Sequence, residues 1–167
     1  METIFQEVER AIQARLYYLA MVMALTIPEV CAALESPTGD TSGRSAQAYK
    51  DWYNANLAAR MPMLTDIDCY SLRCGIVHQG KFGHPKMQYD RAVFVLPHPA
   101  HNTFIGCNFG GAYTHSFIEF CTTIVAAGRQ WFAAHCNDPN VRANLPRLVQ
   151  YHPEGIPPHI VGVPVIG

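Results

Sequence analysis

The stretch that most constrains the fold is an apolar run near the amino terminus. Residues 16–25 read LYYLAMVMAL and carry no charged side chain. A helix built from this run is apolar on every side, so neighbouring elements must cover it all round. At 1.5 Å per residue the run is too short to span a bilayer. It therefore predicts a helix deep in a helical bundle or in an oligomer interface.

The segments on either side of this run also predict helices. Apolar residues recur at helical spacing before it, namely Ile4, Phe5, Val8 and Ile12. We therefore expect one helix over residues 3–25. Pro28 interrupts the pattern and fits the first turn of a new short helix, where its missing N–H costs little. The turn-forming stretch SPTGDTSGRS (36–45) then leads into a helix over residues 46–60.

A helix over residues 66–79 has signals at both ends. Thr65 and Asp68 form an Asp variant of the capping box at its start, and Gly80 is a natural stop. One stripe of this helix is apolar, and Leu72 and Ile76 project from the opposite side. Two apolar faces predict a helix that is either central in the bundle or sandwiched against a partner.

The second half of the chain is mixed. Two β-like runs, RAVFVL and TFIGCNF, predict a hairpin insertion at about residues 90–107. A long helix follows over residues 114–136, with Thr114 or Ser116 as its cap, and then a broken helix up to residue 149. We therefore expect one mainly α-helical domain over residues 1–150.

The last stretch, residues 151–167, is rich in proline and apolar residues. This composition predicts an extended tail, either docked on the domain or loose.

Composition limits the classes of function. The chain has 167 residues, of which 49% are apolar and 15% charged, so one compact domain is expected. A formal net charge of −1 argues against holding nucleic acid mainly by bulk positive charge, although a local site remains compatible. Nothing in the composition favours a membrane partner.

The six cysteines form no CxxC pair and fall mostly in apolar segments, which indicates reduced, buried thiols. The acidic amino terminus lacks the pattern of a signal peptide. Both features predict a cytoplasmic protein.

Two side chains of the helix over residues 66–79 carry candidate chemistry. The imidazole of His78 can transfer protons near neutral pH, and the guanidinium of Arg73 can bind phosphate oxygens in a bidentate way. They lie about 140° apart around the helix axis. We therefore expect them to converge across the two-fold axis of a homodimer rather than within one chain. Glu29 and Asp51 are candidates to orient His78 or to pair with Arg73.

The stretch DIDCYSLRCGIVHQG (66–80) resembles the third-helix motif of the HEPN superfamily, Arg-x4–6-His. The match here is Arg73-Cys-Gly-Ile-Val-His78. The resemblance implies an up-and-down helical bundle over about residues 3–136. It also implies a dimeric RNA-binding protein that cleaves RNA without a metal or cofactor. Arg73 would stabilise the phosphate and His78 would transfer protons.

Other members of this family are non-catalytic modules that bind protein or nucleotide partners, and this remains the alternative function. The chain also departs from the ribonuclease pattern at Cys74. The residue after the arginine is commonly Asn or another polar residue in the ribonucleases.

The remaining histidines suggest a metalloenzyme, which ranks last. His98 and His101 flank the predicted hairpin turn, and His115 and Glu119 are four residues apart in a predicted helix. Neither pair reaches the three or four ligands of a zinc site. We expect a surface loop for the first pair and a plain hydrogen bond for the second. Aromatic residues at helical spacing (Tyr49, Trp52 and Tyr53) can stack on bases, but their spacing favours the core.

Overall fold

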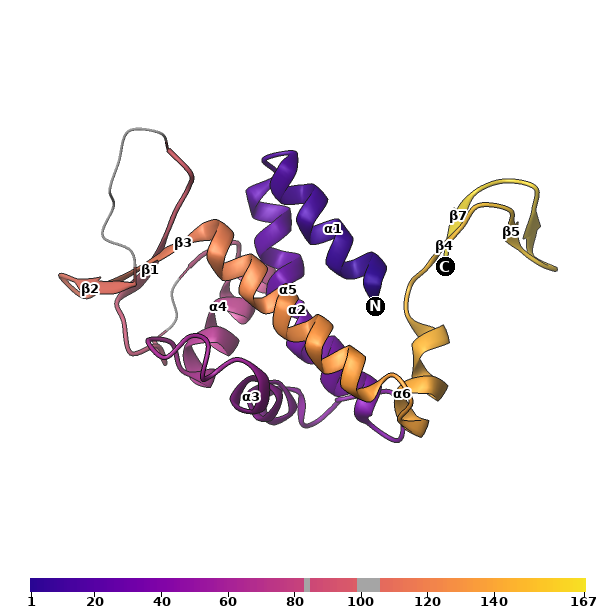
Figure 1. The fold of residues 1–167 in the computed structure, drawn as a ribbon, viewed down its shortest axis with the longest axis horizontal. Coiled ribbons are helices and arrows are strands. Elements are labelled where there is room, and N and C mark those ends of the chain that lie inside the picture. The colour runs from indigo at the N-terminus through magenta and orange to yellow at the C-terminus, as the bar shows by residue number, and fades with distance from the viewer. Residues whose placement is uncertain (83–84, 99–105) are drawn as a thin grey trace.

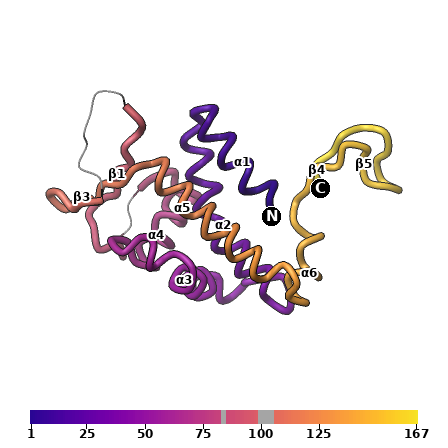
Figure 2. Tube along the Cα trace, in the orientation of Figure 1, coloured from indigo at the N-terminus to yellow at the C-terminus, as the bar shows by residue number. Residues whose placement is uncertain are grey.

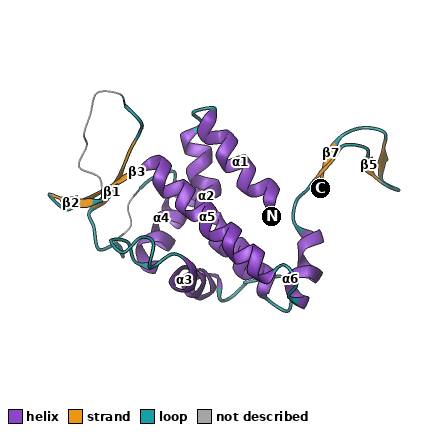
Figure 3. Cartoon of the chain, in the orientation of Figure 1, coloured by secondary structure: helices purple, strands orange, loops and turns teal. Residues whose placement is uncertain are grey.

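The structure is a computed structural model that describes residues 1–82, 85–98 and 106–167. Over these residues it is mainly helical, with small strands at two ends of the molecule (Figures 1 and 3). The helices are α1 (Glu2–Gln13), α2 (Tyr17–Glu35), α3 (Ser45–Asn56), α4 (Asp66–Gln79), α5 (Phe117–His135), α6 (Pro139–Asn144) and the 3-10 helix η1 (Leu145–Arg147). The strands are β1 (Arg91–Val95), β2 (Cys107–Phe109), β3 (Ala112–Ser116), β4 (Tyr151–His152), β5 (Gly155–Ile156), β6 (Ile160–Val161) and β7 (Val165–Ile166).

The prediction of one helix over residues 3–25 is wrong, because the chain reverses between α1 and α2. Arg15 takes a left-handed conformation there, with φ of 59°. The reversal brings the apolar stripe of α1, including the fully buried Phe5 and Val8, against α2 and α5. A single straight helix would leave one side of the apolar run in water. The fold-back therefore covers that side with α1.

The predicted break at Pro28 is also wrong. Pro28 is buried inside α2, which runs for 19 residues from Tyr17 to Glu35. Within the described chain, α2 alone is long and apolar enough to cross a bilayer by length and composition. Half of that stretch is buried, and α2 contacts α1, α3, α4 and α5. It therefore lies centrally among the helices, as predicted, but the expected cover on every side is wrong at its start, where Leu16, Tyr18 and Leu19 are 51%, 56% and 53% exposed.

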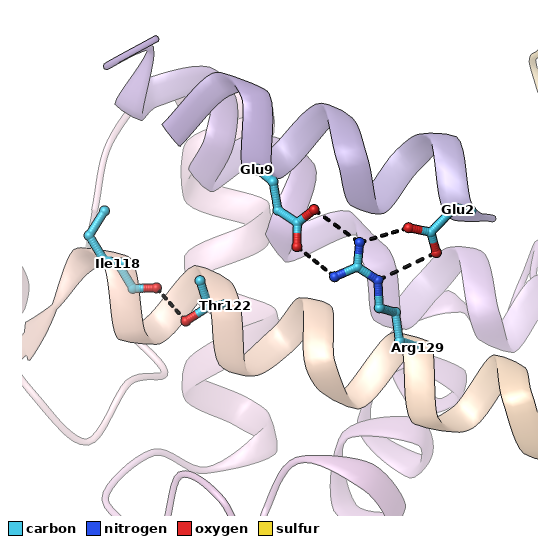
Figure 4. A network of polar contacts seen from close by, with 5 residues as sticks. All are labelled: Glu2, Glu9, Ile118, Thr122 and Arg129. Atoms are coloured by element: carbon cyan, nitrogen blue, oxygen red, sulfur yellow. Dashed lines mark hydrogen bonds and ion pairs between the residues drawn. The ribbon is translucent and has the colours of Figure 1, made fainter. Parts of the chain in front are cut away.

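Helix α5 packs closely against α1 and α2 at Gly128. A Cβ added at this glycine would lie 2.7 Å from Cε1 of Phe5 and 2.9 Å from Cγ2 of Ile27. The next residue, Arg129, donates to the carboxylates of Glu2 and Glu9 on α1, at 2.7 and 2.5 Å (Figure 4). Hydrogen bonds from Arg129 lower the pKa of both carboxyl groups. These partly exposed ion pairs add orientation to a contact that apolar packing already holds.

The strands between α4 and α5 form a sheet in the order β1-β3-β2. β1 runs parallel to β3 with Arg91 opposite Ala112, and β2 runs antiparallel to β3 with Cys107 opposite Thr114. The hairpin predicted between the two earlier runs is therefore wrong, although residues 99–105 between them lie outside the described residues. The hairpin is β2–β3, and its turn is the Gly110–Gly111 pair, both with positive φ.

Ser116 ends β3 and also caps α5, because its hydroxyl accepts the backbone N–H of Glu119. This confirms one of the two predicted caps, whereas Thr114 lies within the strand. The broken helix before residue 149 is confirmed as α6 and η1. Residues 150–167 form an extended arm whose strands pair with each other, β4 with β7 and β5 with β6. Figure 2 shows this arm leading away from the helices.

Candidate functional site

Helix α4 carries Arg73 and His78, and both of its ends are fixed as predicted. The Thr65 hydroxyl accepts the backbone N–H of Asp68 at 3.1 Å, and the Asp68 carboxylate accepts the backbone N–H of Thr65 at 2.9 Å. Gly80 ends the helix in the left-handed conformation, with φ of 64°. The capping box and the glycine stop are confirmed, so α4 holds its side chains at defined positions along the helix.

Asp68 does more than cap the helix. Its carboxylate is fully buried and also accepts the backbone N–H of Gln88 at 2.9 Å and the Gln88 side-chain amide at 2.6 Å. The carboxylate thus joins the start of α4 to the segment that follows its end. The sequence indicated the cap, but no local pattern signalled the contact with Gln88, which lies 20 residues further on.

The two apolar faces of α4 have different fates. Leu72 and Ile76 are buried in the core, whereas Ile67 and Val77 remain 41% and 38% exposed. Tyr18 from α2 donates its hydroxyl hydrogen to the carbonyl of Ile76 at 3.2 Å, close to the end of α4. One face of α4 is therefore a core face, and the other exposes Ile67 in the first turn of the helix and Val77 in the last, next to His78.

Arg73 and His78 meet within one chain, contrary to the expectation that they converge only across a two-fold axis. Nη1 of Arg73 lies 3.1 Å from Nε2 of His78. The angular separation is about 140°, but the flexible arginine side chain crosses it. A guanidinium has only donors, so Nε2 accepts. The contact corresponds to the His78 tautomer with its hydrogen on Nδ1.

Glu29 lies on the other side of the guanidinium. Its carboxylate forms an ion pair with Nη2 of Arg73, and the two side chains are 20% and 17% exposed. Glu29, Arg73 and His78 thus form a chain of contacts that joins α2 to the last turns of α4. His78 itself is exposed.

Asp51 stands elsewhere. It is exposed on α3 and accepts a hydrogen bond from the side-chain amide of Gln47 at 2.7 Å. Among the contacts of the described residues, none joins Asp51 to Arg73 or His78. Of the two carboxylates expected from the sequence, the structure brings only Glu29 to the arginine.

The guanidinium retains unused donors. The Nε atom of Arg73 is buried and has no acceptor in the described structure. A cavity of about 370 Å³ is lined by Glu29 and Arg73 together with polar side chains such as Thr26, Thr41 and Asn144. The arrangement can therefore offer N–H donors to an anionic or polar ligand, while the carboxylate holds the guanidinium in place.

Cys74 and Tyr70 border the site. Burial raises the pKa of the Tyr70 hydroxyl, and a hydrogen bond with the Cys74 thiol raises it further. All six cysteines are free, and Cys31, Cys69 and Cys121 are buried. Burial of thiols as small apolar groups is confirmed for these three, whereas Cys74, Cys107 and Cys136 are only partly covered.

The other candidate residues do not gather. His115 belongs to β3 rather than to a helix, so the predicted pairing of His115 and Glu119 on one helix face is wrong. Nδ1 of His115 lies 2.9 Å from the carbonyl of Ser116, and its ring packs against Phe120. His101 lies outside the described residues. Over residues 1–82, 85–98 and 106–167, no three His, Cys, Asp or Glu side chains are placed to hold a metal ion. Tyr49, Trp52 and Tyr53 are buried core residues, as expected.

Comparison of the chain with family models, with curated proteins and with solved structures finds no match.

Proposed function

We propose that the protein is a cytoplasmic RNA-binding protein with metal-independent endoribonuclease activity, built on an up-and-down bundle of the HEPN type. The observation that carries the proposal is the contact between Arg73 and His78. It places a phosphate-binding cation directly beside an exposed imidazole on one helix. Together with the His78 of a second copy, these groups supply the cation, the base and the acid that cleavage by an RNA 2′-hydroxyl needs.

In the proposed reaction the phosphate replaces Nε2 of His78 as the acceptor for Nη1 of Arg73, which frees that nitrogen. Nε2 then accepts the proton of the 2′-hydroxyl as that oxygen attacks the adjacent phosphorus, and the bond from phosphorus to the 5′-oxygen breaks. The leaving 5′-oxygen takes a proton from an imidazolium, which the His78 of a second protomer supplies. Arg73 donates to the phosphate oxygens on which negative charge accumulates. The products are a 2′,3′-cyclic phosphate and a 5′-hydroxyl end.

A homodimer fits this scheme for two reasons. The reaction needs one base and one acid, and each chain offers one His78. The exposed apolar side chains near it, Val77 on α4 and Tyr18 on α2, supply a surface that a second copy can cover.

The alternative is a non-catalytic module that binds a protein or nucleotide partner. The ion pair between Arg73 and Glu29 favours it, because the carboxylate neutralises the guanidinium and the arginine is only 17% exposed. In this case the pair joins α2 to α4 as a structural contact, and a phosphate would have to compete with Glu29 for the guanidinium.

The experiment is cleavage of mixed-sequence RNA by the full chain in the presence of EDTA. We expect products with cyclic phosphate ends and a loss of at least about 100-fold in rate for Arg73→Ala and for His78→Ala. Matched controls are Arg10→Ala, an arginine whose side chain is 67% exposed, and His159→Ala in the exposed arm, which should keep the full rate. Inert wild-type protein, or equal rates in all four variants, would exclude this mechanism and leave the binding module.

A further inference from the structure

A second cavity lies on a different side of α2 from Arg73. It has a volume of about 410 Å³ and is lined by the last turn of α2, by α3 and by the end of α5. Glu35, one of its lining residues, is six residues beyond Glu29, which is about 9 Å along the helix and on another face. Both tryptophans of the chain, Trp52 and Trp131, line this cavity. Its size is that of a small-molecule site.

The aromatic residues of the cavity form an ordered group. The rings of Trp52 and Trp131 meet edge to face, with centroids 6.5 Å apart. The imidazole of His135 stacks on Trp131, with centroids 5.3 Å apart and planes 15° apart. The His135 side chain is 41% exposed. The group therefore presents a flat, partly exposed ring that is already fixed in orientation, which suits a planar ligand.

The polar atoms of the cavity are incompletely paired. Glu35 accepts the indole N–H of Trp131 at 2.8 Å, and Nδ1 of His135 donates to the carbonyl of Trp131 at 2.8 Å. Nε2 of His135 lies 3.6 Å from the carboxylate of Glu35, and the two side chains are 41% and 42% exposed, so both can meet a ligand in the cavity.

Two donors of the cavity lack acceptors. The indole N–H of Trp52 is buried and has none among the described residues. Arg44 lies exposed at the rim, and no ion pair involving it occurs in the described part of the chain. Buried donors without acceptors are uncommon in folded proteins. Because the Trp52 N–H is covered, the polar groups that a ligand can reach are the carboxylates of Glu35 and Asp51, the ring edge of His135 and the guanidinium of Arg44.

We propose that this cavity binds a guanine base. Guanine carries two adjacent donors, N1–H and the exocyclic amine, beside the acceptor O6. Both donors pair with the carboxylate of Glu35, the base stacks on the exposed ring of His135, and a 5′-phosphate is bound by Arg44 at the rim. Adenine, cytosine and uracil do not offer two adjacent donors to one carboxylate. The base comes from a free nucleotide or from single-stranded RNA, and binding is independent of cleavage at Arg73 and His78.

The test is titration of the full chain with GMP, AMP, CMP and UMP, followed by intrinsic fluorescence and by calorimetry. Both tryptophans line the cavity, so their emission reports binding directly. We expect GMP to bind at least about ten-fold more tightly than the other three nucleotides, and Glu35→Gln to remove that preference. The amide oxygen introduced by this substitution still accepts the indole N–H of Trp131, so the fold should be kept. Glu7→Gln, on the exposed side of α1, is the matched control and should bind GMP like the wild type.

Two further arms complete the test. Arg44→Ala should weaken binding of GMP to the level of guanosine and leave guanosine binding unchanged. This result tests the proposal even if Glu35→Gln fails to fold. Short single-stranded RNA with or without one guanine separates the two sources: tighter binding than GMP assigns the site to RNA, and equal binding assigns it to the nucleotide. Absence of GMP and RNA binding at millimolar concentration, or equal affinity for all four bases, would overturn the proposal. Arg73→Ala should bind GMP normally even if cleavage is never observed.

Discussion

Removal of the buried carboxylate of Asp68 should destabilise the protein far more than removal of its neighbour Asp66. Both residues lie in the first turn of α4, where negative charge interacts favourably with the helix dipole. Asp68 also accepts two donors from Thr65 and two from Gln88. Asp66 accepts the backbone N–H of Ile67 and a long contact from Asn54. Comparing the two variants therefore separates the effect of the hydrogen bonds to Asp68 from the effect of its negative charge.

The magnitude follows from these contacts. Loss of the cap costs about 1 kcal/mol, since the exposed Thr65 regains water. The two partly buried donors of Gln88 cost about 1 kcal/mol each when the carboxylate is removed. We expect Asp68→Ala to lose about 3 kcal/mol of unfolding free energy, and Asp66→Ala less than about 1 kcal/mol.

The assay is urea denaturation of both variants and the wild type, with the slope m compared to verify two-state behaviour. In a thermal scan the Asp68→Ala loss corresponds to about 6–12 °C. If the two alanine variants are equally stable, the carboxylate of Asp68 contributes only its charge, and its hydrogen bonds with Gln88 do not stabilise the fold.

Other predictions concern packing and thiols. Gly128→Val should lower the unfolding free energy by about 2 kcal/mol or more, because the larger side chain overpacks against Phe5 and Ile27. The control Ala126→Val, on the exposed side of α5, should change it by no more than about 0.5 kcal/mol. Equal urea midpoints for the two variants would refute the close contact at Gly128. Burial raises the pKa of the Cys121 thiol to about 12. Iodoacetamide at pH 8 should therefore leave Cys121 and the other buried thiols unmodified in folded protein, and should label all six cysteines in urea. Detection of alkylated Cys121 in native protein by mass spectrometry would contradict this.

The sequence predicted those elements whose signals are local. The helix α4 begins and ends as expected because Thr65, Asp68 and Gly80 act on their own neighbours. The turn between α1 and α2 could not be predicted in this way. No glycine or proline stands there, and Arg15 takes its left-handed conformation because the reversal lets α1 cover α2. Pro28 misled the prediction for the opposite reason, since tertiary packing keeps it inside a helix that its local effect would end.

The candidate site shows the same division. Arg73 and His78 were found from their spacing and chemistry, but their contact depends on the path of a long side chain, which angles around a helix do not specify. The choice between Glu29 and Asp51 as partner required the packing of α2 against α4. The sheet was mispaired because residues 114–116 were assigned to the long helix, which hid the strand that follows the Gly110–Gly111 turn.

The direct passage from β3 into α5 has a mechanical consequence. No loop separates them, because Ser116 is both the last residue of the strand and the cap of the helix. β3 and α5 thus form one continuous segment, of which the helix alone is about 28 Å long. It starts at the centre of the sheet and ends beside Trp131 and His135. Because no loop separates β3 from α5, a displacement of β3 within the sheet would also displace the first turn of α5.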